Sequence, residues 1–140
     1  MLMKSSLIAL ASIALSSAAF AESAGPGAKV FNRCKGCHTI GPGATNRVGP
    51  PLNGIVGRTP GKASGYEYSE AMTAFGAGHI WDEATLASYL TDPRGLVSGT
   101  KMSFPGLRKP QDVADLVTYL KTYRVDGSTD SVQSAEQTPK

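Results

Sequence analysis

The sequence lacks the features of several large classes of protein. Beyond its first residues, no apolar stretch approaches the length needed to cross a membrane. The formal net charge is only +3 and no long basic run occurs, whereas a nucleic-acid-binding protein usually carries a stronger basic stripe. No alternation of apolar and polar residues indicates a β-strand, and no internal repeat stands out. These absences argue against a nucleic-acid partner and stable membrane insertion, and they favour an all-α protein.

The first 21 residues have the pattern of a secretory signal peptide. Lys4 gives a small positive start, and an apolar run diluted by serine follows over residues 7–15. Ala19 and Ala21 place small residues where signal peptidase cleaves, and the run is too short to span a bilayer comfortably. We therefore expect cleavage after Ala21 and export of the mature chain, in a bacterium to the periplasm.

Short helices are expected at four places along the mature chain. Ser69 and Asp82 suit the N-cap positions of two helices, and Pro93 would stop the second of these. Pro110 fits the first turn of the last helix, which carries apolar residues at helical spacing, and Gly127 would mark its end. The expected helices cover residues 27–36, a short segment from residue 70, residues 83–92 and residues 110–126.

Long loops rich in glycine and proline separate these helices, mainly over residues 41–65 and 93–110. Such loops raise the conformational entropy that folding must overcome, and about 119 residues make one domain with a modest core. We predict a small all-α domain over residues 22–125, made of short helices and long structured loops. Residues 126–140 are polar without an apolar face, and we predict a disordered tail.

Both cysteines lie in the stretch "NRCKGCHTIGPG", as Cys34 and Cys37, and His38 follows directly. A thioredoxin-like thiol switch would place such a pair after a strand in a βαβ unit, and no strand is indicated here. A zinc site would have at most three ligands in this stretch, and only His79 remains as an obvious fourth. The third possibility, covalent attachment of haem, needs no further ligand from a second motif.

The pattern Cys-x-x-Cys-His is typical of c-type haem attachment. Two thiols three positions apart on a helical turn can each bond one vinyl-derived carbon of the porphyrin, and the following His38 then points at the iron. Attachment outside the cytoplasm agrees with the signal peptide. A haem is also a large apolar body, so it would supply core that the loops cannot. We therefore predict one haem c, covalent through Cys34 and Cys37, with His38 as the proximal iron ligand.

The second axial position of the iron decides between electron transfer and ligand or peroxide chemistry. Met102 lies in "SGTKMSFPG", where glycine and proline let the backbone turn tightly and where a methionine has no helical core to fill. Met72, in "YSEAMTAF", suits a packing role, and His79, in "GAGHIW", suits a surface or hydrogen-bonding role. Met102 is thus the predicted sixth ligand.

Several motifs in the same order resemble those of class I cytochromes c, close to the group of bacterial cytochrome c2 and mitochondrial cytochrome c. They span roughly residues 27–123: "CKGCHT", "GPPLNGIVGR", "GYEYSE", "IWDEATLASYL", "DPRGLVSGTKMSFPG" and "DLVTYLK". The resemblance implies a class I cytochrome c fold wrapped around the haem, with the axial methionine at Met102. It also implies that the Pro50 carbonyl accepts a hydrogen bond from the ring N–H of His38. The tail after Asp126 has no counterpart in the family.

The resemblance implies further contacts around the haem. Tyr68 and Trp81 match residues that hydrogen-bond a haem propionate, and Arg58 matches a positive side chain near that propionate. Tyr89 and Thr100 match groups beside the axial methionine and the haem edge. All five are therefore predicted site residues.

The resemblance implies a monomeric electron carrier of the respiratory or photosynthetic kind and not an enzyme. Its donor would be a cytochrome bc1 complex or a dehydrogenase, and its acceptor an oxidase, a reaction centre or a peroxidase. Two alternatives stay open: a haem enzyme or gas-binding sensor with an open sixth position, and a haem module bound to a dehydrogenase. Bases near the presumed haem edge would steer redox partners; they are Lys29, Arg33, Lys35, Arg47 and Lys101.

Overall fold

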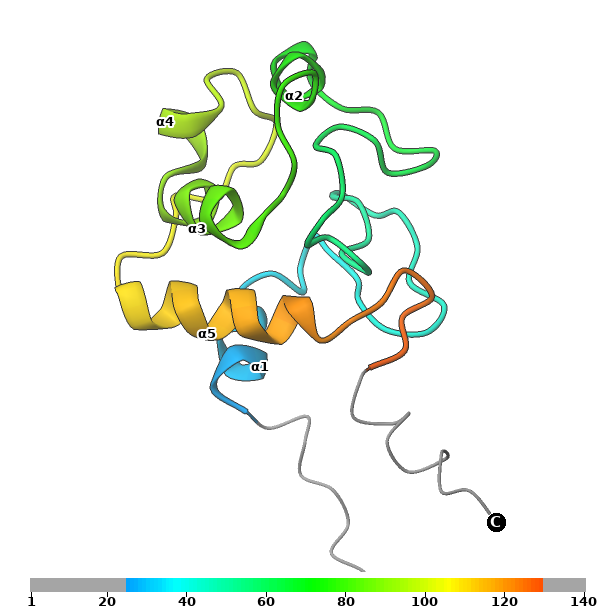
Figure 1. Cartoon of the computed structure of the whole chain (residues 1–140), viewed down its shortest axis with the longest axis vertical. Coiled ribbons are helices and arrows are strands. Elements are labelled where there is room, and N and C mark those ends of the chain that lie inside the picture. Colours follow the sequence, from blue (N-terminus) through cyan, green and yellow to red (C-terminus); the bar gives the residue numbers. More distant parts are fainter. Residues whose placement is uncertain (1–24, 130–140) are drawn as a thin grey trace, which may run out of the picture.

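The computed structural model describes residues 25–129, which fold into short helices joined by long irregular segments (Figure 1). Along the chain they are α1 (Pro26–Phe31), α2 (Glu70–Gly76), α3 (Glu83–Thr91), α4 (Pro93–Leu96) and α5 (Pro110–Lys121). Within residues 25–129 the only β-type pairing is a single bridge between Tyr123 and Thr129, so the all-α prediction is confirmed. None of the helices in this range is long and apolar enough to cross a membrane.

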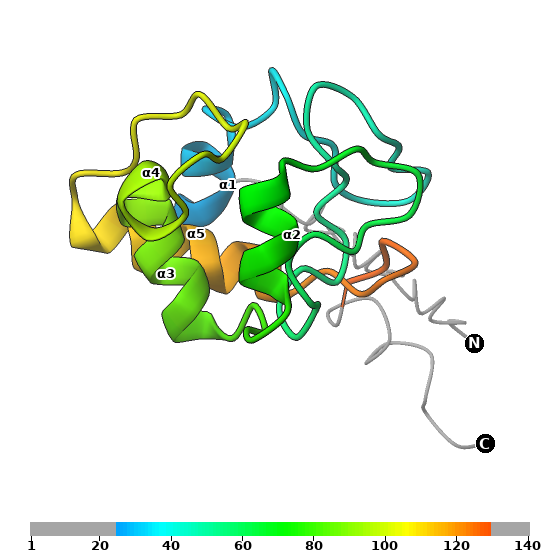
Figure 2. The same cartoon turned by 90° about the horizontal axis from the view of Figure 1, so that it is seen from above.

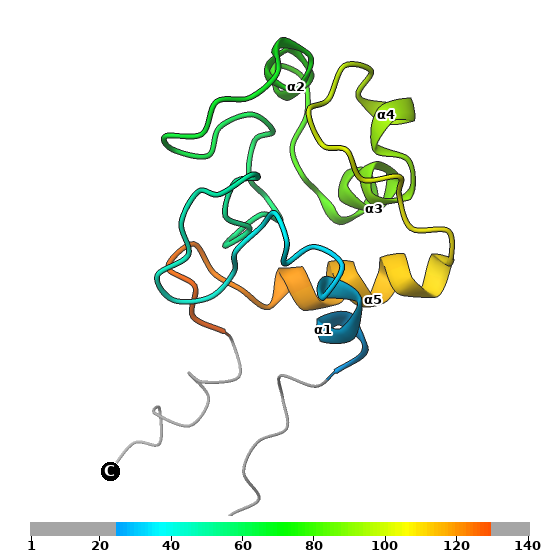
Figure 3. The ribbon, with the colours of Figure 1, turned by 180° about the vertical axis from the view of Figure 1, so that it is seen from behind.

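The first and last helices of the described chain meet, with α1 lying across α5 (Figures 1 and 3). Gly27 sits in the contact, because any β-carbon there would collide with the backbone of Asp115 and with Tyr119. The rings of Phe31 and Tyr119 lie 5.5 Å apart at their centroids. A glycine and an aromatic pair thus let the helices approach closely and fix where the cysteine segment begins.

The caps of α2 and α3 form as the sequence predicts. Ser69 accepts a hydrogen bond from the backbone N–H of Met72 at 3.1 Å, and Asp82 accepts one from that of Thr85 at 2.7 Å. Each bond satisfies one N–H that the first turn of a helix leaves unpaired. These caps fix where α2 and α3 begin after the long loops.

Two helix boundaries differ from the prediction, one at the end of α1 and one near Pro93. α1 ends at Phe31, and the cysteine segment continues as separate hydrogen-bonded turns instead of the same helix. Pro93 does follow the end of α3, yet it also opens the four-residue helix α4, which was predicted as irregular. The cause is local, because Asp92 caps this turn by accepting from the N–H of Gly95 at 3.0 Å and proline suits a first turn.

The end of the chain also differs from the prediction. α5 ends at Lys121, and residues 124–129 form a turn that folds back toward the loops. Gly127 belongs to that turn, at φ +83°, and does not end the helix. The predicted domain boundary at residue 125 therefore falls inside an ordered turn. The predicted signal peptide (1–21) and residues 130–140 of the predicted tail lie outside the described residues.

The core fills the space between α5, α3 and the loop that follows α4. Figure 2 shows α3 and α4 above the first part of α5, with the loops of residues 39–69 gathered on the other side. Leu107 and Leu116 are 1% exposed, and burying a leucine side chain stabilises a fold by roughly 1.5–3 kcal/mol. The remaining core residues on α3 and α5 are Leu86, Tyr89, Leu90, Val113, Val117 and Leu120.

Candidate haem site

The cysteine segment follows α1 as two tight turns. The N–H of Cys34 bonds to the carbonyl of Phe31 at 2.8 Å, and the N–H of His38 bonds to the carbonyl of Cys34 at 2.9 Å. Both cysteines are free thiols; Cys34 is half-buried against the core, where burial raises the pKa of its thiol, and Cys37 is exposed. The turns therefore present two free thiols and a histidine in sequence along one short stretch.

The structure offers no support for a zinc site at these cysteines. Among residues 25–129, no three histidine, cysteine, aspartate or glutamate side chains converge as a metal site would require. His79, the fourth ligand that the zinc alternative needed, is engaged at the end of α2. Its Nδ1 lies 2.8 Å from the carbonyl oxygen of Phe75, and its ring stacks on the Phe75 ring with centroids 3.9 Å apart.

His38 is held by the loop that follows it. Its Nδ1 lies 2.7 Å from the carbonyl oxygen of Pro50. A carbonyl oxygen only accepts, so Nδ1 carries the proton and donates it, and Nε2 keeps its lone pair free for a metal. Burial lowers the pKa of His38, which keeps the ring in the neutral form that binds metals. Gly49 packs flat against this ring, because a β-carbon there would lie 2.7 Å from Nδ1.

Met102 lies half-buried against the core in the loop between α4 and α5. The Thr100 hydroxyl oxygen accepts a hydrogen bond from the backbone N–H of Met102 at 3.3 Å and lies 2.7 Å from the hydroxyl of Tyr89 on α3. Burial raises the pKa of Tyr89, so its hydroxyl stays protonated. The Lys101 ammonium donates to the carbonyl of Glu67 at 3.0 Å and pins the same loop from the other side. Three of the predicted site residues thus form one network.

Met72 and Met102 differ as the sequence predicts. Met72 is 7% exposed and belongs to the core that α2 helps to cover, so its predicted packing role is confirmed. Met102 packs on the edge of that core from an irregular segment and is only half-buried. Of the two, Met102 is the thioether that remains accessible to a bound group.

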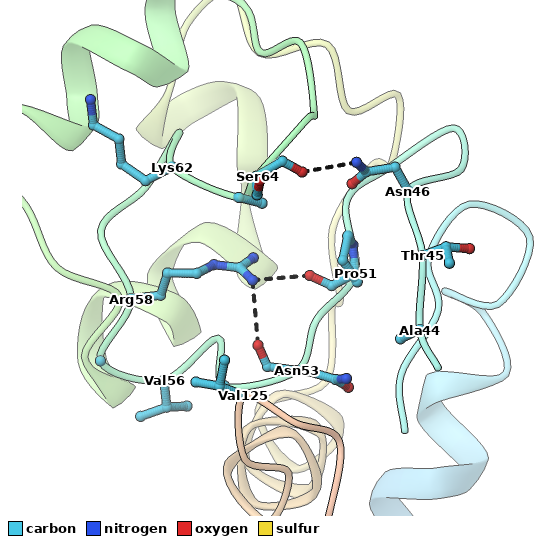
Figure 4. Close-up of a pocket in the computed structure, with 13 residues that line it drawn as sticks. Ala44, Thr45, Asn46, Pro51, Asn53, Val56, Arg58, Lys62, Ser64 and Val125 are labelled. Atoms are coloured by element: carbon cyan, nitrogen blue, oxygen red, sulfur yellow. Dashed lines mark hydrogen bonds between the residues drawn. The ribbon is translucent and has the colours of Figure 1, made fainter. Parts of the chain in front are cut away.

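Arg58 and Tyr68 lie in the loop before α2, and Trp81 lies in the segment between α2 and α3. The Arg58 guanidinium donates to the carbonyl oxygens of Pro51 at 3.0 Å and Asn53 at 3.4 Å (Figure 4). Burial lowers its pKa from the usual value for arginine. The Tyr68 hydroxyl accepts from the N–H of Ala63 at 3.1 Å. Trp81 is 5% exposed and lies against Tyr89, with ring centroids 5.0 Å apart.

Sequence reasoning missed two residues that organise these loops. The amide of Asn53 bonds to both the N–H and the carbonyl of Gly41, at 2.8 and 2.9 Å, and so closes the loop that carries Pro50. The Tyr66 hydroxyl donates to the carbonyl of Val48 at 2.7 Å, and its ring meets the Tyr68 ring edge-on. "PLNG" carried a weak signal for the first, because asparagine beside glycine is typical of turns.

The predicted basic residues lie on α1, in the cysteine segment, in the loop after it and in the Met102 loop. The Arg33 guanidinium lies over the Phe104 ring, 5.5 Å from its centroid, and Arg47 donates to the carbonyl of Lys35 at 3.3 Å. Lys29 and the four other predicted bases are exposed, and none of the five forms an ion pair within residues 25–129. Their charge is therefore open to a partner.

The residues fit a covalently bound haem. The two thiols are free, the lone pair of His38 Nε2 is available, and Met102 is accessible. The half-buried apolar side chains against the core suit a flat apolar group. These side chains include Val30, Ile40, Leu52, Tyr68, Phe75 and Phe104.

Comparisons with known proteins agree with this chemistry. The family model for cytochrome c matches residues 24–124. Cytochrome c2 of Rhodoblastus acidophilus is 49% identical over 102 residues, which cover 73% of this chain and 94% of that protein.

Solved structures show the same fold. Cytochrome cH from Methylobacterium extorquens matches with a TM-score of 0.63 and 45% identity, covering 69% of this chain and 95% of the other. Cytochrome c2 from Rhodospirillum centenum matches with a TM-score of 0.67 and 35% identity, covering 71% and 98%.

Proposed function

This chain belongs to the cytochrome c family, and on that premise we propose that it carries single electrons between periplasmic redox complexes, with its haem iron between His38 and Met102. The fold is that of a class I cytochrome c. The family binds haem c covalently through the cysteines of its Cys-x-x-Cys-His motif, which are Cys34 and Cys37 in this chain. Electron transfer is the activity that its cytochrome c2 relatives indicate.

Bound haem c supplies an iron that gains and loses one electron. The protein's part on the proximal side is to fix one nitrogen. With Nδ1–H committed to the Pro50 carbonyl at 2.7 Å, His38 presents Nε2 in a single tautomer and orientation. A ring held in this way does not have to reorganise when the iron changes charge.

The observation that carries the proposal is the hydrogen-bond network that holds Met102. Its backbone N–H bonds to the Thr100 hydroxyl, and that hydroxyl is paired with buried Tyr89. A methionine thioether as axial ligand raises the reduction potential. With His38 and Met102 both holding the iron, no substrate would have access to it, which supports a carrier and not an enzyme.

The exposed bases support docking through the face where the cysteine segment meets the Met102 loop. We propose a cytochrome bc1 complex or a dehydrogenase as donor, and an oxidase, a reaction centre or a peroxidase as acceptor. Acidic patches on these partners would complement Arg33, Lys35 and Arg47. We further propose that the carrier is a monomer and reaches the periplasm by cleavage after Ala21, so the mature protein should begin at Glu22.

The test of this assignment is Met102→Leu. Leucine keeps the size of the side chain but removes the sulfur, so the reduced variant should bind carbon monoxide and show a lower reduction potential. Met72→Leu is the matched control: it should leave carbon monoxide binding and potential near the wild-type values, because Met72 packs in the core. Visible spectra and potentiometry measure both effects.

Two outcomes would favour the alternatives. Rapid and complete carbon monoxide binding by the reduced wild type near neutral pH would indicate an open iron and an enzyme or gas sensor. Isolation of the native protein only as a stoichiometric complex with a dehydrogenase would indicate a haem module and not a free carrier.

A further inference from the structure

The segment of residues 124–129, here named the C-terminal strap, is an ordered turn, and residues 125–129 lie beyond the stretch that matches the family. The N–H of Gly127 bonds to the carbonyl of Arg124, and the N–H of Arg124 bonds to the carbonyl of Ser128, both at 2.9 Å. The Asp126 carboxylate accepts from the N–H and the hydroxyl of Ser128, at 2.9 and 2.7 Å. The strap is therefore closed by hydrogen bonds between its own residues.

The strap and Tyr123 just before it contact the loop of residues 41–54 at two points, and each contact involves a glycine. Gly127 is buried at φ +83°, and a β-carbon there would lie 2.6 Å from the nitrogen of Pro42 and even closer to the carbonyl of Gly41. The N–H of Gly54 bonds to the carbonyl of Tyr123, just before the strap, at 3.1 Å. At Gly127 the backbones approach so closely that only glycine fits.

The contact at Gly54 continues onto the strap itself. A β-carbon at Gly54 would lie 2.7 Å from a methyl group of Val125. Figure 4 shows Val125 beside Asn53 and Val56, at the base of the groove that Arg58 enters. The strap thus covers Gly54 as well as Gly41.

The two contact points are the two ends of one loop, residues 41–54, and this loop carries Pro50. Asn53 ties the ends together through Gly41, and the N–H of Leu52 bonds to the carbonyl of Thr39 at 2.9 Å. The strap takes no part in these hydrogen bonds, and it contacts both ends of the 41–54 loop.

We propose that the C-terminal strap positions the proximal histidine. By holding both ends of the 41–54 loop, it keeps the Pro50 carbonyl at hydrogen-bond distance from His38 Nδ1. This inference rests on the proposed role of His38 as iron ligand. Gly127 and Gly54 are positioning residues, since neither touches His38.

A strap that positions His38 affects the properties of the iron ligand, which a strap that only stabilises the fold does not. The bond from Nδ1–H to a carbonyl raises the basicity of Nε2 and makes the histidine a stronger donor, which favours the oxidised iron. If the strap is loosened, the bond is made for a smaller fraction of the time. The reduction potential should then rise, and the Nδ1 proton should exchange faster with water.

The experiment compares Gly127→Ala with Gly43→Ala in the full-length holoprotein. Both glycines have a left-handed backbone, at φ +83° and +75°, so both substitutions introduce similar backbone strain. They differ in space, because nothing lies within 4 Å of a β-carbon at Gly43, whereas one at Gly127 would collide with Gly41. The comparison therefore separates the strap contact from the strain.

Three protons report the result by NMR hydrogen exchange: the N–H groups of Gly41 and Gly54 and the Nδ1–H of His38, each bonded in the structure. We expect Gly127→Ala to speed exchange of all three by about tenfold, as local opening does, and to raise the potential. Gly43→Ala should change neither. Asp126→Ala removes the carboxylate that accepts from Ser128 and leaves the backbone bonds of the strap in place, so it should act in the same direction and more weakly. It serves as the test if Gly127→Ala fails to fold.

Two results would overturn the proposal. The first is faster exchange at Gly41 and Gly54 with no change at His38 and no change in potential, which would make the strap a stabilising element only. The second is the same response from Gly43→Ala, which would assign the effect to backbone strain. Failure of the proposed axial ligation would be seen separately, in the carbon monoxide test on Met102→Leu.

Discussion

At the scale of single residues, Gly49 is a position that leaves no space for a side chain beside the His38 ring. It has ordinary negative φ, so its importance is steric only. We expect Gly49→Ala to push the His38 ring off the Pro50 carbonyl and to destabilise the holoprotein by roughly 1–3 kcal/mol, as overpacking does. Thermal unfolding and the visible spectrum of the haem measure the change.

Gly36 gives the control for that prediction. It lies in the same cysteine segment, and nothing is within 4 Å of a β-carbon there. Gly36→Ala should leave stability unchanged or slightly raise it, because alanine reduces the entropy of the unfolded chain. Equal losses of stability in the two variants would show that the packing of Gly49 against His38 has no special role.

The residues proposed to hold the haem, and one group that orients them, could be named from the sequence, whereas the closure of the loop around them could not. The Cys-x-x-Cys-His motif predicted the roles of Cys34, Cys37 and His38, and the resemblance predicted the Pro50 contact, which the structure contains. Asn53 gave only the weak turn signal of "PLNG", because its function depends on Gly41, a residue brought to it by folding. Sequence spacing reveals residues that act together because they are close along the chain. Loop closure depends on residues that are distant in the sequence and meet only in the folded protein.

At the scale of elements, the charge of a single capping residue predicts how α3 responds to acid. Hydrogen bonds from the backbone N–H and the side chain of Thr85 hold the pKa of the Asp82 carboxyl below its usual range. A carboxyl with a lowered pKa in the folded state contributes stability above its unfolded pKa, near 3.9, and loses it as the pH falls through the folded value. The stabilising charge of Asp82 is thus present at neutral pH and absent in strong acid.

Asp82→Ala should therefore lower the melting temperature at pH 7 and have a much smaller effect at pH 2. Asp82→Asn should keep most of the stability at pH 7, since asparagine also caps a helix, and should lose the pH dependence that this group contributes. Calorimetry of the three holoproteins across this pH range checks both statements. An Asp82→Ala deficit that is the same at pH 2 and pH 7 would contradict them.

Among the helices that the structure describes, α1, α2, α3 and α5 were predicted correctly in type, and the shortest, α4, was not. α3 and α5 carry enough turns for periodicity to be visible, whereas the four residues of α4 are too few to show any. The strap has no periodicity at all. Its order comes from Gly127 meeting Gly41, so a polar sequence without an apolar face was predicted as disordered when it is held by backbone contacts.

At the scale of the whole molecule, the distribution of charge matters more than its total. The net charge is small, yet five exposed bases flank the cysteine segment and the Met102 loop without ion pairs among the described residues. Steering of a partner depends on this local field. It is screened over about 8–10 Å at physiological ionic strength, so association with an acidic partner should slow as salt rises.

Lys35 is the best residue for testing the field alone. Lys101 bonds to the carbonyl of Glu67 and holds the Met102 loop, and Arg33 lies over Phe104, so replacing either would disturb the site as well as its charge. The ammonium of Lys35 makes no such contact within the described chain. Lys62 provides the control, because it is an exposed base beside the groove of Arg58, away from the cysteine segment.

We expect Lys35→Glu to lower the second-order rate of electron transfer to a purified partner about two- to fivefold at low salt, with the reduction potential nearly unchanged. The variant should also show a flatter dependence of the rate on salt. Lys62→Glu alters the net charge by the same amount and should change the rate much less, since its charge lies outside the docking face. Stopped-flow kinetics over a salt series decide the matter. A wild-type rate that is indifferent to salt would mean that docking is apolar, through the surface around Phe104, and that these bases are only a solvated face.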